Sequence, residues 1–168
     1  SAKCVGQRIW EKAKGFIQKA FTIIFAATLI VWFLQNFDAG LHLVTSTDQS
    51  LLAQIGSLVA PLFAPLGFGD WRVSTALITG FMAKESVVST LTVLLGGKTA
   101  LLTTLFTPFT AYVFLIFTLL YTPCVAAVAT VRREMGTVRT AAGIALLQCV
   151  TAWIVAFIVH GIGMLFGL

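Results

Sequence analysis

The segment AFTIIFAATLIVWFLQNF, residues 20–37, contains no charged side chain. A helix of this length extends about 27 Å, which matches the hydrocarbon thickness of a bilayer. The sequence therefore predicts a membrane-spanning helix here. Charged residues make up only 10% of the 168-residue chain and hydrophobic residues 58%, whereas soluble domains carry about 25% charged residues. We therefore expect residues 1–168 to form a single membrane domain of an all-α integral membrane protein.

Prolines and charges interrupt the other apolar segments. Residues 50–68 contain Pro61 and Pro65, so a short or re-entrant helix is expected there. Residues 73–96 are long enough to span the membrane, and residues 99–122 should kink or divide at Pro108.

The end of the chain adds a segment too short to cross, residues 125–131, and a final span over residues 141–168. In total we expect three to four spanning helices with one or two broken or re-entrant half-helices.

The positive charges predict the orientation of the chain. Five of the eleven cations lie in the first 19 residues, and Arg132, Arg133 and Arg139 form a second group. Both groups flank apolar segments, as cytoplasmic loops do. We expect residues 1–19 to be an amphipathic cytoplasmic lead-in to the transmembrane region 20–168. Residues 8–19 could be an interfacial helix or an extension of the next helix, and both interpretations stay open. No basic face suits nucleic acid, which we exclude as a partner.

Lys84 and Glu85 are charges placed near the middle of an apolar segment. A charge at the bilayer centre costs about 2.5–3.5 kcal/mol on insertion scales, so such residues face protein or a wet cavity. Glu85, Ser89 and Thr92 are spaced to share one helix face. The segment is therefore a candidate ion pathway. The alternative is that Lys84 and Glu85 pair with distant partners and hold the bundle together.

The motif Tyr121-Thr122-Pro123-Cys124 is the second candidate site. Proline leaves the carbonyl one turn earlier without a helical donor, and free carbonyls at membrane depth occur beside protein or cavities. Cys124 after such a break could be a soft metal ligand. The alternative is a small buried apolar residue, as most free cysteines are.

The last apolar segment places Cys149, Trp153, Ala156 and His160 on one helix face. His160 could be a ligand or proton carrier, or it could lie at the membrane interface. The 168 residues contain no phosphate loop, HExxH motif or Ser-His-Asp order. We therefore expect this segment not to be an enzyme.

Two quoted motifs, FMAKESVVSTL from Phe81 and YTPCVAAVATVRREMG from Tyr121, resemble the second, C-terminal Gate region of the ferrous iron transport protein B family. The stretches WEKA from Trp10 and IVWFL from Ile30 are similar to the helix that begins that region. The resemblance implies the C-terminal half of the pathway of a GTPase-linked Fe²⁺ importer in the bacterial inner membrane. Cys124 matches the Gate cysteine and Glu85 the carboxylate of the Lys-Glu motif.

The resemblance also implies the partners. Fe²⁺ would be the transported ion, with no cofactor bound permanently. An N-terminal GTPase and first Gate region, or a split-gene partner, would complete the pathway, and GTP would bind only at that separate domain. A homo-oligomer is compatible with the sequence.

The candidate ion pathway comprises Cys124, Glu85, Ser89, Tyr121 and Thr122, with Lys84, His160 and Cys149 as further candidates. Two other functions stay open: a structural or assembly membrane module, and a Gate-type transporter of another solute such as a nucleoside.

Overall fold

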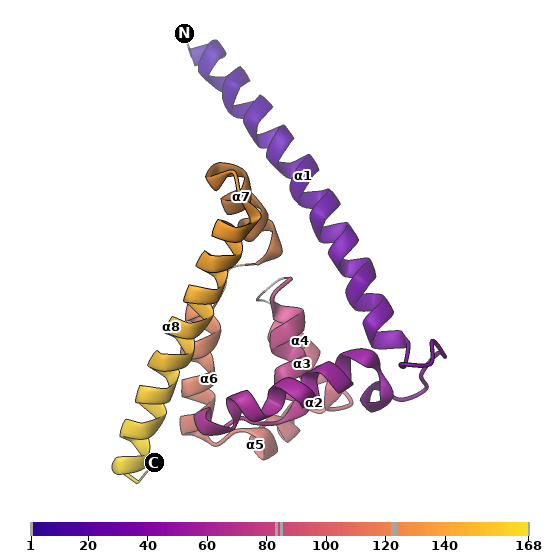
Figure 1. Ribbon diagram of the computed structural model, residues 1–168, viewed down its shortest axis with the longest axis vertical. Coiled ribbons are helices and arrows are strands. Elements are labelled where there is room, and N and C mark those ends of the chain that lie inside the picture. The colour runs from indigo at the N-terminus through magenta and orange to yellow at the C-terminus, as the bar shows by residue number, and fades with distance from the viewer. Residues whose placement is uncertain (1, 83, 85, 122–123, 168) are drawn as a thin grey trace.

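The computed structural model describes residues 2–82, 84, 86–121 and 124–167 (Figure 1). These residues form helices joined by turns, and the described part contains no strand beyond an isolated bridge between Phe37 and Leu43. The prediction of an all-α fold is confirmed. By length and composition, two helical stretches could cross a membrane, or three if one bent pair counts as a single span.

The first helix, α1, is continuous from Ala2 to Asn36, a length of 35 residues. Residues 8–19 thus pass directly into the apolar segment, which agrees with the interpretation of these residues as an extension of the next helix. The apolar part, Phe21–Asn36, is shorter than the two full candidate spans. Large side chains such as Phe21, Phe25 and Trp32 are exposed along it. In a bilayer, lipid or another protein segment would cover this surface.

Helix α2, Leu51–Phe63, runs through Pro61 and ends just before Pro65. It is followed by a short 3-10 helix, η2, Ala64–Leu66, which ends at Gly67 with a left-handed φ of 86°. A right-handed helix cannot continue through that conformation. Helix α3, Trp71–Gly80, then leaves at 102° to the preceding pair. The short or re-entrant helix expected over residues 50–68 is therefore observed. A short turn, η1 (Thr47–Gln49), precedes α2.

Residues 73–96 are long enough to span the membrane but do not form one continuous helix. Helix α3 ends at Gly80, and α4, Ser86–Leu94, folds back against it. Gly80 permits this close return, since a side chain there would meet Val87. The hydroxyl of Thr79 donates to that of Thr90 across the two helices at 3.2 Å. The charge at Lys84 thus lies in a break between helices, where it can reach partners outside its own helix.

The chain divides at Pro108 as predicted. The short η3, Thr99–Leu101, and α5, Leu102–Leu105, precede α6, Pro108–Leu120. Thr107 and Thr110 form a capping box at the start of α6, which satisfies backbone donors that the first helical turn leaves free.

Helices α6 and α7, Val125–Met135, are two parts of one discontinuous span. The stretch Pro108–Met135 is long and apolar enough to cross a membrane, whereas the 11 residues of α7 are too few, as expected. Helix α8, Val138–Leu165, packs along both parts and forms the predicted final span.

A phenylalanine-rich core holds the broken helices together. Phe63, Phe68 and Phe117 pack against one another, with ring centroids 5.3–6.2 Å apart. Ala152 and Ala156 of α8 are fully buried against this core, because small residues let helices approach closely. The core fixes α2, α3, α6 and α8 around the break at the end of α6.

Candidate functional site

Lys84, in the break between α3 and α4, contacts the end of α6 at the break before α7, although 35 or more residues separate the two breaks in sequence. Its ammonium nitrogen Nζ donates hydrogen bonds to the carbonyl oxygens of Tyr121 at 2.8 Å and Leu119 at 3.2 Å. The same nitrogen lies 4.7 Å from the centre of the Tyr121 ring, within cation–π range. The cation therefore sits on the C-terminal end of α6, where helix carbonyls carry partial negative charge.

The choice of Leu119 has a local cause in the sequence. Proline has no N–H, and in a continuous helix the N–H of residue 123 would bond the carbonyl of residue 119. Pro123 thus leaves the carbonyl of Leu119 without its helical donor, and the Lys84 ammonium supplies one. Pro123 itself lies outside the described residues.

A backbone hydrogen bond also connects the break after α3 with the break before α7. The N–H of Val125, at the start of α7, donates to the carbonyl of Phe81 at 2.9 Å. Cys124 is the N-cap residue of α7 and is half-buried, and its side chain makes no capping hydrogen bond. Lys84 lies within electrostatic range of the thiols of Cys124 and Cys149.

Tyr121 positions the carbonyl that Lys84 binds. Its side chain is buried, and its ring stacks on Phe117 with centroids 5.5 Å apart. Its hydroxyl donates a long hydrogen bond of 3.4 Å to the carbonyl of Leu77 on α3. The aromatic side chain is therefore anchored in the core while the backbone, extended with ψ of 170°, turns away from the helix.

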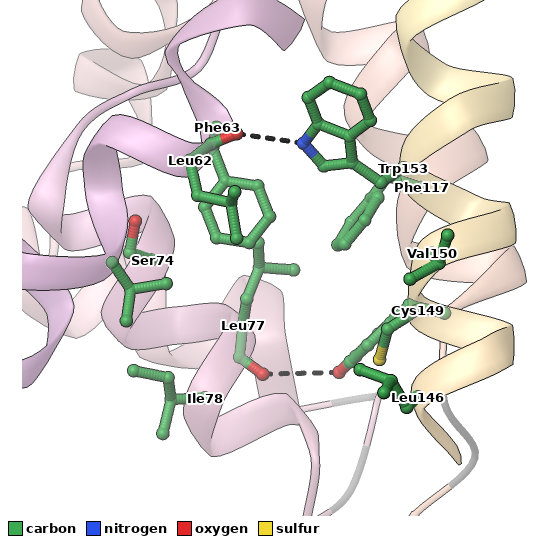
Figure 2. Close-up of a pocket in the computed structure, with 12 residues that line it drawn as sticks. Leu62, Phe63, Ser74, Leu77, Ile78, Phe117, Leu146, Cys149, Val150 and Trp153 are labelled. Carbon is green, nitrogen blue, oxygen red and sulfur yellow. Dashed lines mark hydrogen bonds between the residues drawn. The ribbon is translucent and has the colours of Figure 1, made fainter. Parts of the chain in front are cut away.

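An apolar cavity of about 440 Å³ lies between α2, α3, α6 and α8, beside this break (Figure 2). Cys149 and Trp153 face it from α8, and Phe63 and Leu77 face it from α2 and α3. The indole N–H of Trp153 donates to the carbonyl of Leu62 at 2.9 Å. This bond ties the last helix to α2 across the cavity.

The structure brings four of the predicted site residues into one neighbourhood: Lys84, Tyr121, Cys124 and Cys149. Ser89 lies apart, in a hollow of about 290 Å³ that Thr90 and Asn36 also line. His160 is also distant. Its ring stacks on that of Phe109 with centroids 6.1 Å apart, and a side chain at Gly67 would meet it. Glu85 and Thr122 lie outside the described residues.

The free carbonyl that the sequence predicts one turn before Pro123 is that of Leu119. The bond from Trp153 to Leu62 was not predicted, and no sequence signal identifies it, because these residues meet only through the tertiary fold. Among the described residues, no three His, Cys, Asp or Glu side chains gather to hold a metal ion. A cation here would meet backbone carbonyls and single thiols.

Comparison with known proteins agrees with this architecture of interrupted helices. The family model "Gate: Nucleoside recognition" matches residues 17–138, well over half of the chain. The chain therefore belongs to the Gate family. No solved structure matches it.

Two relatives from different organisms are named Fe(2+) transporter FeoB. The chain is 40% identical to the Fe(2+) transporter FeoB of Staphylococcus aureus (strain MSSA476), across 99% of the chain and 26% of that protein. It is 35% identical to the Fe(2+) transporter FeoB of Methanocaldococcus jannaschii, across 92% of the chain and 24% of that protein. The resemblance drawn from the two motifs is thereby confirmed. The chain spans about a quarter of the length of these curated relatives.

Proposed function

We propose that this chain forms half of the membrane pathway of a GTPase-linked bacterial ferrous iron importer. The observation that carries the proposal is the hydrogen bond from Lys84 to the Tyr121 carbonyl, at the break that ends just before α7 with Cys124 as its N-cap. Transporters place substrate sites at such discontinuous helices, where unwound carbonyls coordinate cations. The relatives named Fe(2+) transporter match the chain on both sides of the break.

The proposed ion site combines a thiol with backbone and side-chain oxygens. Cys124 would supply sulfur, Glu85 a carboxylate, and Tyr121 and Thr122 carbonyl oxygens, with Ser89 further along the path. Few and moderately weak ligands suit a site that must release its ion, because tight binding would stop conduction. Cys149 and His160 remain further candidates.

The other parts of the pathway would come from sequence outside this chain. The relatives are about four times longer than their matched segment, which leaves room for a GTPase and a first Gate region. GTP would bind there and not at this chain, to which we assign no catalysis. The matched relative in Porphyromonas gingivalis, 28% identical over 99% of the chain and 26% of that protein, is named a fusion of Fe(2+) transport protein A with FeoB. A transport protein A would thus be a further partner.

A nucleoside is the second candidate solute, because the family description names nucleoside recognition. The cavity beside the break is large enough for a base, and aromatic residues line it. Its lining is nearly all apolar, however, and the Trp153 N–H is already bonded to Leu62. A ribose would lose its hydrogen bonds to water without replacement, which is costly. The cavity lining therefore argues against a nucleoside as the solute.

The test is Fe²⁺ uptake by the complete transporter, meaning this chain with the regions that its relatives carry. Cys124→Ser and Glu85→Gln should each lower uptake by about tenfold or more, since each removes a ligand or its charge. Cys4→Ser is the matched control, because Cys4 is exposed near the start of α1. Wild-type uptake in both site variants, at normal protein levels, would refute the site.

A metal titration separates transport from a purely structural role. The purified complete transporter should bind Fe²⁺, and Mn²⁺ or Zn²⁺ should compete for the site. If no binding is detected, the polar residues hold helices together and the assembly-module alternative gains support.

A further inference from the structure

We propose that Lys84 is a tethered stand-in for the transported cation. Its ammonium occupies the carbonyl oxygens at the end of α6 when no ion is present, and the ion and the ammonium exclude each other. This inference rests on the proposed function, because it assigns a role at the same break. It makes Lys84 a residue that sets how tightly the pathway holds its ion.

The geometry around Lys84 is that of a bound cation. An ammonium has three donors and no acceptor, and two of these donors bond the carbonyls of Tyr121 and Leu119. Backbone carbonyls at a helix C-terminal end are the groups that coordinate ions in channels and broken-helix transporters. The π-face of Tyr121 contacts the same ammonium. The chain's own cation thus occupies carbonyl oxygens of the kind that coordinate transported ions.

The described partners of Lys84 are neutral atoms. The ammonium bonds two peptide carbonyls and one aromatic face. These described contacts are all with neutral groups, and Glu85, which the proposed ion site includes, lies outside the described residues. A second cation at the same carbonyls would lie close to the ammonium in a poorly screened environment, where like charges repel strongly. The incoming ion must therefore displace Lys84.

Displacement is mechanically feasible for this side chain. Lysine carries its charge on a flexible four-carbon stem, and Lys84 lies in the turn between α3 and α4. Rotation about that stem can move the ammonium off the carbonyls without unfolding either helix. A simple helix cap would have the same contacts, but it would not compete with an ion, and this difference can be measured.

The first experiment measures Fe²⁺ binding, under anoxic conditions, to the complete transporter with Lys84→Gln. The glutamine amide can still donate to the carbonyls, which protects the fold, but it carries no charge. We expect the half-saturating Fe²⁺ concentration to fall about tenfold. A hydrogen bond from a charged donor is stronger than one from a neutral donor, and the difference changes the binding equilibrium constant by about that factor. Lys84→Arg keeps the charge and should bind as the wild type does.

Lys98→Gln is the matched control for the loss of one lysine. Lys98 is exposed in the turn that follows α4, so its loss should leave Fe²⁺ binding unchanged. Unchanged or weaker binding in Lys84→Gln would overturn the proposal and leave Lys84 as a structural cap.

A second measurement detects the displacement directly in the wild-type transporter. Mn²⁺ at saturating concentration should increase acetylation of Lys84 by acetic anhydride, while acetylation of Lys98 stays constant. Equal labelling of Lys84 with and without Mn²⁺ would contradict mutual exclusion.

Failure of this inference differs from failure of the proposed function. A wild-type transporter that neither binds nor takes up Fe²⁺ refutes the iron pathway itself, whatever Lys84 does. A transporter that takes up Fe²⁺ but binds it equally well with Lys84→Gln refutes only the role of Lys84.

Discussion

Gly80 is the last residue of α3, and its lack of a side chain lets α4 pack closely against α3. A β-carbon there would collide with Val87 and would lie 2.8 Å from the hydroxyl of Tyr121. The residue therefore permits both the return of α4 and the anchoring of the tyrosine beside Lys84. A stability measurement can test this contribution.

We predict that Gly80→Ala destabilises the protein by about 1–3 kcal/mol, the usual cost of overpacking a tight contact. Gly143→Ala is the control, because Gly143 lies in α8 with no atom near its added methyl group. The control should be neutral or slightly stabilising, since alanine favours a helix over glycine. Thermal unfolding midpoints in detergent compare the two, and a Gly80→Ala midpoint at or above the wild-type value would contradict the prediction.

At the residue level, the sequence predicted where the unusual chemistry lies but not how it is paired. The charge of Lys84 and the break at Pro123 are visible because each is costly in an apolar segment. Distant partners for Lys84 were one of the two interpretations, but the sequence did not identify them as the backbone carbonyls that the structure shows. That pairing depends on α3, α4 and α6 meeting in space, which no local pattern encodes.

At the level of elements, a hydrogen bond from a tryptophan side chain ties α8 to α2. The indole of Trp153 bonds the carbonyl of Leu62, and Ala152 and Ala156 provide close packing. Helix α8 also packs along α6 and α7. The hydrogen bond of Trp153 therefore links α2, through α8, to α6 and α7.

We predict that Trp153→Phe lowers the free energy of unfolding by about 1–3 kcal/mol, since the carbonyl of Leu62 loses its donor in an apolar setting. Trp10→Phe should have little effect, because Trp10 is 70% exposed on α1. Denaturation of both variants in mixed micelles provides the measurement. Equal stabilities would mean that the hydrogen bond contributes nothing.

The sequence predicted breaks caused by proline better than breaks caused by packing. Pro108 begins α6, and Pro65 together with Gly67 ends the helical stretch formed by α2 and η2. Both breaks arise from local backbone chemistry. The break after Gly80 was missed, because one glycine in an apolar run also occurs in continuous membrane helices. Its cause is the fit of Val87 against Gly80, a tertiary contact.

In the whole molecule, Figure 1 shows the N-terminal half of α1 and the junction of α7 with α8 in the upper half of the view, and the C-terminus at the bottom. The two groups of positive charge belong to these upper segments, and both groups are expected on the cytoplasmic side. We therefore propose an inner-membrane location with the N-terminus in the cytoplasm and the end of α8 outside.

Labelling of single cysteines with a membrane-impermeant maleimide tests this topology. A variant that keeps only Cys4 should react in inverted vesicles and not in intact cells. A variant that carries only Leu165→Cys, a position 87% exposed near the end of α8, should react in intact cells. Labelling of both positions from the same side would reject the proposed topology.

The hydrogen bond between Val125 and Phe81 has a mechanical consequence. It fastens the start of α7 to the end of α3, so the two broken regions share one hinge. A movement of α7, whose last turn carries Arg132 and Arg133, would therefore pull on the end of α3 and on the turn that carries Lys84.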